Sequence, residues 1–166
     1  NLQTNQNANS DKAILKATFG VSSGKWYWEG RVIYSDDSNI NIGVVTDSAT
    51  VNSVVTADYT YLKQMENLMS VGHIFQVALN MDDGAWYIGL NNTWYNSATA
   101  AEIAAGNTSN AEDTGLSGTF LPAFYENAGG SGTGYTANFG QDDTFAGAIS
   151  SAGNTDGNGK GCLLYT

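Results

Sequence analysis

Cysteine, proline, histidine and positive charge are all scarce in this sequence of 166 residues. The single cysteine, Cys162, cannot form an intrachain disulfide, so the fold must be held together by a hydrophobic core. A chain of this length can bury such a core as one domain. The single proline, Pro122, and the 20 glycines favour many turns and short strands over long helices.

The charge balance excludes two classes of partner. The six Lys and Arg residues stand singly along the chain, against 16 Asp and Glu, which gives a formal net charge of −10. Binding to a nucleic-acid backbone or to an anionic membrane surface needs clustered Lys and Arg. We therefore expect no nucleic acid partner. We also expect no membrane insertion, because the sequence contains no apolar run of about 18 residues.

The sequence also contains few residues that could bind a metal ion or a cofactor. One histidine, His73, and one cysteine cannot by themselves supply the four ligands of a zinc site, and His73 reads as a turn residue before a strand. The segment 154–159 places oxygen-bearing side chains at alternating positions, as a calcium loop does. Asn154 at the first position and Tyr165 at the twelfth favour a polar loop instead, although a bound calcium ion there stays open. We expect no cofactor.

Short alternating segments dominate the chain. The Asp-Gly step in 81–84 predicts a hairpin between two of them. Thr99 and Glu102 form a capping-box pattern and Gly106 a stop signal, which predict one short helix within 97–106. The predicted strands cover 13–19, 26–34, 41–45, 74–80, 86–90, 120–125, 135–139 and 162–165. This pattern is typical of an all-β antiparallel sandwich with at most one short helix.

The segment 26–34 is the most strongly patterned strand. Trp26, Trp28, Val32 and Tyr34 fall on one face, and the alternate residues, from Tyr27 onward, fall on the other. Both faces are partly apolar, which suits a strand inside a stack of two sheets. We expect residues 1–12 to be a linker or N-terminal extension and residues 13–166 to form the domain.

Several segments, in order along the chain, carry a family resemblance. They are Ser23–Glu29, Asn41–Val45, Phe75–Gly84, Leu121–Phe124 and Ala137–Gln141. Together they resemble the motifs of SPRY domains, most closely SPRY-like domains of phage and marine-virus structural proteins. The resemblance implies a SPRY or concanavalin A-like jelly roll that acts as a recognition module through loops at one edge of the sandwich. It does not carry over a particular partner, because the motifs build the core.

The chain departs from the family pattern at two positions. Asn80 stands where SPRY domains usually have Asp, and Gly30 stands where Val is common. A glycine inside a strand marks either a bulge or a close approach of another group. Neither departure argues against the fold.

The resemblance implies a non-catalytic recognition module on the extracellular surface of a virion, that of a phage, which binds a host-surface glycan or protein. A structural domain that binds other virion subunits and a cellular SPRY interaction module are alternatives, and a homo-oligomer formed through the parent chain stays open. A glycoside hydrolase fits less well. It needs two carboxylates across a sugar bond, whereas the adjacent pairs 36–37, 82–83 and 142–143 would point to opposite faces of a strand and read as turn residues.

Loop aromatics beside Asn, Asp and Glu are the candidate binding residues. Aromatic rings stack on sugar rings and anchor protein partners, while the neighbouring polar groups form hydrogen bonds. The segments that carry such side chains predict a ligand-binding set of Asp36, Asp37, Tyr59, Tyr61, Trp94, Tyr95, Tyr125 and Glu126. No catalytic residue and no metal ligand is expected.

Overall fold

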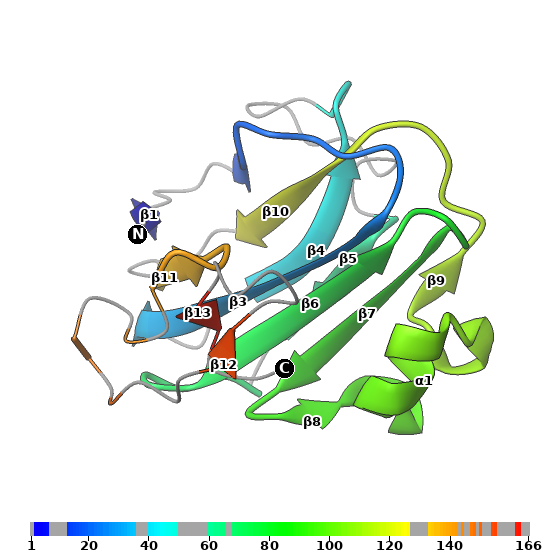
Figure 1. Ribbon diagram of the computed structural model, residues 1–166. Helices are drawn as coiled ribbons and strands as arrows, with labels where there is room; N and C mark the ends of the chain where they lie inside the picture. Colours follow the sequence, from blue (N-terminus) through cyan, green and yellow to red (C-terminus); the bar gives the residue numbers. More distant parts are fainter. Residues whose placement is uncertain are drawn as a thin grey trace.

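The computed structural model describes residues 2–6, 13–35, 40–49, 60–65, 68–126, 133–142, 144, 147–148, 150, 154–155 and 162–163. Within them the chain is a sandwich of antiparallel sheets, as the sequence predicts. Figure 1 shows the larger sheet in front of the smaller one. No helix among the described residues has the length and apolar character needed to cross a membrane.

The larger sheet has the strand order β1-β11-β3-β6-β7-β8, and β9 also pairs with β7. Its central strands are β3, β6 and β7, and the β6–β7 hairpin forms where the Asp-Gly step predicts it. The strands are β1 (Leu2–Gln6), β3 (Lys25–Ser35), β6 (Ile74–Asn80), β7 (Ala85–Leu90), β8 (Thr93–Trp94), β9 (Asp113–Thr114) and β11 (Thr133–Asn138).

The smaller sheet has the order β2-β10-β4-β5. Its strands are β2 (Ala13–Lys16), β4 (Ile40–Thr46), β5 (Leu62–Gln64) and β10 (Phe120–Glu126). A separate pair joins β12 (Asn154–Thr155) to β13 (Cys162–Leu163). The strand β1 lies within the stretch that the sequence assigns to a linker or extension, and it pairs with β11.

The main core lies between the two sheets. Alternate residues of β3, β6 and β7 point into it, and Trp28, Phe75 and Trp86 are at most 2% exposed. Phe75 makes edge contacts with Phe124 of β10 and Tyr135 of β11, with ring centroids 5.4 and 5.8 Å apart. The side chains that the alternation places inside are therefore the ones that join the sheets.

Gly30 makes room for this aromatic cluster. A Cβ on Gly30 would overlap the ring of Phe75, the residue opposite it on β6. Gly30 pairs in regular register with Ala137, and the register shift of the β3–β11 pair lies further along, between Gly134 and Tyr135. Of the two explanations for this glycine, the structure shows the close approach.

A second apolar cluster covers the other face of the smaller sheet. It contains Ile14, Val45, Ala49, Ala123 and Tyr125. Tyr125 was expected where the predicted strand 120–125 meets a loop, with its ring available for binding, but it lies within β10 and is only 3% exposed. The strand continues past the predicted end because β10 pairs with both β2 and β4 through Glu126.

The one α-helix among the described residues, α1 (Ala100–Ala105), forms as predicted. Thr99 accepts a hydrogen bond from the backbone N–H of Glu102, and the Glu102 carboxylate accepts one from the N–H of Thr99. Gly106 ends the helix with a left-handed φ of 79°. These local signals set where the helix begins and ends.

Candidate functional site: a pocket under the α1 helix

The edge of β7 positions α1 over the larger sheet. The two short strands β8 and β9 pair with opposite ends of β7, so the chain between them leaves the sheet and returns to it. This excursion contains α1 and the 3₁₀ turns η2 (Tyr95–Ser97) and η3 (Thr108–Asn110). It packs on the outer face of the sheet, the face that points away from the main core.

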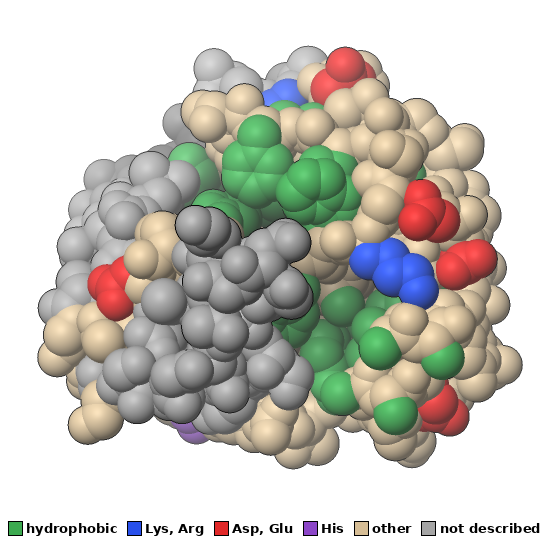
Figure 2. All heavy atoms as spheres, in the orientation of Figure 1, with side chains coloured by type: hydrophobic (Ala, Val, Ile, Leu, Met, Phe, Trp, Pro, Cys, Tyr) green, Lys and Arg blue, Asp and Glu red, His purple; other side chains and the backbone are tan. Residues whose placement is uncertain are grey.

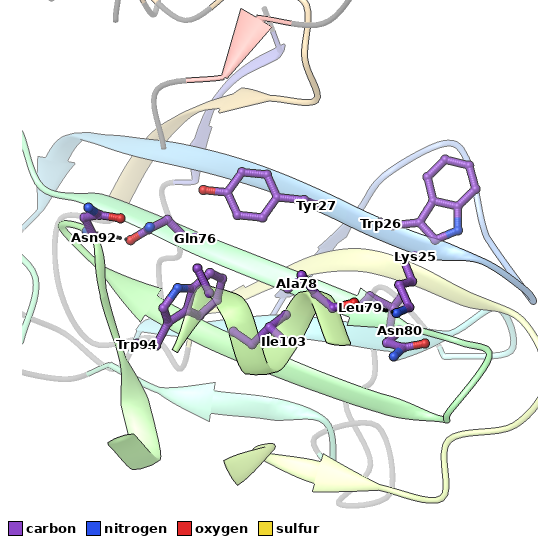
Figure 3. Close-up of a pocket in the computed structure, with 12 residues that line it drawn as sticks. Lys25, Trp26, Tyr27, Gln76, Ala78, Leu79, Asn80, Asn92, Trp94 and Ile103 are labelled. Carbon is purple, nitrogen blue, oxygen red and sulfur yellow. Dashed lines mark hydrogen bonds between the residues drawn. The ribbon is translucent and has the colours of Figure 1, made fainter. Parts of the chain in front are cut away.

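A pocket of about 270 Å³ lies between α1 and the outer face of β3 and β6. We call it the α1 pocket. Figure 3 shows the strands on one side and the helix on the other, and Figure 2 shows hydrophobic side chains gathered in the hollow next to the helix. The pocket is lined by Lys25, Trp26, Tyr27, Gln76, Ala78, Leu79, Asn80, Asn92, Trp94, Ala100, Ile103 and Ala104.

The pocket exists because a small residue lies between large ones. Ala78 of β6 stands opposite Tyr27 on β3 and Tyr87 on β7. Tyr27 meets Trp94 edge to face, with ring centroids 6.2 Å apart. Since the alanine side chain ends at its methyl group, the rings and the helix bound a space that the sheet itself does not fill.

Gln76 is the polar group in this floor. Its side chain is 1% exposed, and its Oε1 accepts the backbone N–H of Asn92 at 2.8 Å. That bond fixes the orientation of the amide, so the Nε2 group is the end left to donate. Among the residues that the structure describes, no hydrogen-bond acceptor for Nε2 is present, and Gln76 lines the pocket.

Lys25 bridges the pocket at one end. Its Nζ donates to the carbonyl oxygen of Ala104 at 2.8 Å, which ties β3 to the end of α1. Asn80 lies beside it, and its Nδ2 donates to the Asp83 carboxylate at 2.7 Å. An aspartate at position 80 could not donate this bond at neutral pH, so the departure from the family pattern has a local use.

A buried carboxylate lies in the next row of the outer face. Glu29 is fully buried, and its Oε1 accepts a hydrogen bond from the hydroxyl of Tyr27 at 2.8 Å. Glu29 stands between Asn138 of β11 and Gln76 of β6 in the strand register. Three polar residues, Asn138, Glu29 and Gln76, therefore lie side by side across the outer face. The hydrogen bond to Glu29 holds the Tyr27 ring in place.

The other acidic groups near the pocket are engaged in turns and caps. Asp82 accepts the backbone N–H of Gly24 at 2.7 Å, Asp83 is bonded to Asn80, and Glu102 belongs to the capping box. This confirms the prediction that Asp82 and Asp83 are turn residues. The described part of the chain contains no group of three or more His, Cys, Asp or Glu side chains that could hold a metal ion.

Tyr87 anchors the far wall of the helical excursion. Its hydroxyl donates to the carbonyl oxygen of Asn107 at 2.8 Å. Burial raises the pKa of Tyr87 above 10.0, and the negative charges of Asp83 and Glu102 raise this pKa further. The phenol is therefore neutral at physiological pH and acts as a structural donor.

The structure brings one of the eight sequence-predicted binding residues into the pocket, Trp94. Tyr95 follows it but packs against the main core, with the Nζ of Lys63 5.0 Å from its ring centroid. Tyr61 is also half-buried, edge-on to Phe120 at 5.1 Å. Tyr125 is buried within β10, as described above.

Four predicted binding residues cannot be placed by their side chains. Asp36, Asp37 and Tyr59 lie outside the described residues, as does the side chain of Glu126. The eight residues do not form one described cluster, and their role in binding stays a prediction. The calcium-like segment 154–159 is described only at Asn154 and Thr155.

Sequence reasoning missed Lys25, Tyr27, Gln76 and Ile103 as site residues. The alternation in 26–34 did place Tyr27 on the face opposite Trp28, and the helix over 97–106 was expected. No signal in the sequence showed that the helix packs on that face. Figure 3 also shows that the side chain of Trp26 points away from α1, and that side chain is 45% exposed.

Comparison with known proteins supports the fold and leaves the ligand open. No protein-family model matches the sequence, and no curated protein matches it. A crystal structure of the SPRY domain of human HERC1 matches with a TM-score of 0.57 and 14% sequence identity, over 84% of this chain and 96% of that one. The chain has a SPRY-like fold. At this level of identity the likeness concerns architecture alone.

Proposed function

We propose that this chain is a non-catalytic recognition module that holds its ligand in the α1 pocket. The observation that carries the proposal is the pocket itself: aromatic and aliphatic walls with a few polar groups, among them the oriented amide of Gln76. Binding sites typically combine an apolar lining with a few placed polar groups. A SPRY-like fold, known as a recognition architecture in the family that the sequence resembles, supports the same function.

The placement of the carboxylates supports a binding role over hydrolysis. A glycoside hydrolase keeps two carboxyl groups free to face a sugar bond. Around the pocket, the carboxylates of Asp82, Asp83 and Glu102 accept hydrogen bonds within turns and a helix cap, and Glu29 is fully buried. Each of these groups has a structural task.

We further propose that the module works on the surface of a virion, outside the cell. The support is the resemblance of the motifs from Ser23 to Gln141 to SPRY-like domains of phage and marine-virus structural proteins. Its partner there would be a host-surface protein or glycan, with other virion subunits as the second candidate. Cross-linking on intact particles that carry the parent protein distinguishes these: cross-links to host-envelope material support the first, and cross-links only to virion proteins support the second.

The pocket is tested by filling it. Ala78→Leu extends a side chain from the floor into the space, while Ala101→Leu adds the same side chain to an exposed position of α1 that does not line the pocket. The purified chain is assayed in parallel against a display library of short random peptides and an array of bacterial-envelope glycans. Binding that Ala78→Leu abolishes and Ala101→Leu preserves supports the site. Binding that survives Ala78→Leu rules the pocket out.

A further inference from the structure

We infer that the α1 pocket receives a single apolar side chain of a protein partner, together with a backbone carbonyl that accepts a hydrogen bond from the Nε2 group of Gln76. This inference rests on the proposed function and names the chemical class of its ligand.

The size of the pocket suits a small group, such as one side chain, better than a large ligand. Sites for small-molecule ligands usually enclose about 300–1,000 Å³. The α1 pocket, at about 270 Å³, lies below that range. A side chain of the size of Leu, Met or Phe, presented by a longer segment that runs across the rim, suits such a space.

The walls of the pocket favour an apolar group over a sugar. Ala100, Ile103 and Ala104 form the helix side, and Ala78 forms the floor. A sugar ring carries hydroxyl groups around most of its edge, and burying them against these methyl groups would leave several without partners. An unpaired polar group loses its bonds to water without replacement. A leucine or phenylalanine side chain has no such groups.

Gln76 supplies the directional contact. Its Oε1 is already bonded to the N–H of Asn92, so the amide cannot rotate by half a turn without losing that bond. The Nε2 group of Gln76 is therefore available as a hydrogen-bond donor, and a ligand must supply the acceptor. A backbone carbonyl next to the inserted side chain meets this requirement, because an extended peptide carries one at every residue.

The charges around the pocket select the partner segment further. Asp82 and Asp83 lie in the hairpin that adjoins Asn80, and Glu102 lies in α1 between the lining residues Ala100 and Ile103. Among the described residues that line the pocket, the one cation is Lys25, and its Nζ is bonded to the carbonyl oxygen of Ala104. With a net charge of −10 on the chain, a basic segment is attracted, a neutral one is tolerated and an acidic one is repelled.

The experiment uses the peptides selected on the intact chain in the parallel screen described above. We expect them to share one aliphatic or aromatic residue and to lack clustered acidic residues. Replacing that residue by alanine in the peptide should weaken binding at least as strongly as Ala78→Leu does. Selected peptides with no common apolar residue, or glycans as the only ligands that Ala78→Leu abolishes, would overturn the inference while leaving the proposed function intact.

Gln76 is tested separately. Gln76→Glu keeps an oxygen for the N–H of Asn92 but replaces the donor by a second acceptor, so peptide affinity should fall by about tenfold or more, in line with the loss of one hydrogen bond. Thermal melting checks that the variant is folded. Since a buried charge could unfold it, the decisive measurement is on the unmodified chain: the side-chain NH₂ resonances of Gln76 should shift with saturable dependence on the selected peptide.

The outcomes distinguish failure of the inferred ligand from failure of the proposed binding site. If Gln76 resonances stay fixed while Ala78→Leu abolishes peptide binding, the pocket binds a ligand but the inferred hydrogen bond is wrong. If Ala78→Leu changes the binding of no probe, both the inference and the proposed site fail.

Discussion

The two faces of the larger sheet carry different kinds of side chain. The inner face carries large apolar side chains such as Trp28, Phe75 and Trp86, which interlock with the smaller sheet. The outer face carries Gln76, Ala78 and buried Glu29, and part of it is left open beneath α1. Both faces belong to the same strands and differ by one residue step. The comparison teaches that alternate positions of one strand can build a packed core on one face and leave a pocket on the other.

The largest loss of stability is expected when a large side chain of the inner face is removed. Phe75→Ala removes a fully buried ring that contacts Phe124 and Tyr135, so the free energy of unfolding should fall by about 3–5 kcal/mol. Chemical denaturation measures this change. Ala78→Leu, three residues further along the strand and on the other face, should change the same free energy far less. Equal losses in the two variants would contradict the division between the faces.

A smaller inner-face effect comes from adding a methyl group. Gly30→Ala places a Cβ against the Phe75 ring, so the free energy of unfolding should fall by about 1–3 kcal/mol through overpacking.

Its cause is checked in a double-mutant cycle. In the background of Phe75→Ala the ring is gone, and Gly30→Ala should then cost much less. A cost that persists without the ring would mean that Gly30 is needed for its backbone and not for the space above it.

The outer face should respond to the helix cap. Thr99→Ala removes the side-chain oxygen that accepts the Glu102 N–H, so the free energy of unfolding should fall by about 1 kcal/mol. Because α1 forms one wall of the pocket, affinity for a pocket ligand should fall as well. Thr114→Ala, at an exposed position of β9, is the control and should change neither quantity. If the affinity for a pocket ligand stays constant in Thr99→Ala, the helix is not part of the binding site.

The smallest effect concerns alkaline pH. The pKa of Tyr87 is raised above 10.0 in the folded chain, so the unfolded chain loses this proton at a lower pH than the folded chain does. The resulting stability is fully present below pH about 10 and is lost as the pH rises through the folded pKa.

Melting temperatures recorded across alkaline pH measure the decline. Tyr95 contributes in the same direction, because burial, and then the charge of Glu112, raise its pKa as well. Tyr87→Phe should make the decline shallower and cost about 1 kcal/mol at neutral pH through the lost bond to Asn107. If the melting temperature of Tyr87→Phe falls with alkaline pH as steeply as that of the unmodified chain, the decline is caused by groups other than Tyr87.

Local patterns predicted much of the fold. The β6–β7 hairpin and α1 depend on residues close together in the chain: the alternation over 74–80, the Asp-Gly step, and the cap formed by Thr99 and Glu102. Such signals are complete within a few residues, which is why they can be recognised without a structure.

Burial of individual aromatic residues could not be predicted in the same way. Tyr125 lies next to a polar segment and resembles a loop residue, yet β2 and β4 flank its strand and Ile14 and Val45 pack around it. Ile14 and Val45 are about 110 and 80 positions away from Tyr125 in the sequence, respectively. Only the pairing of distant strands decides whether such a ring is covered.

The sequence by itself therefore determined the antiparallel sandwich, the hairpin, the capped helix and the small residues at Gly30 and Ala78, because each follows from local conformation or strand alternation. The tertiary structure alone decided that the helix returns over the outer face. There it sets Trp94 and Ile103 against Tyr27 and leaves the Gln76 amide facing the space between. That outcome depends on β8 and β9 pairing with opposite ends of β7, a long-range choice that no short segment encodes.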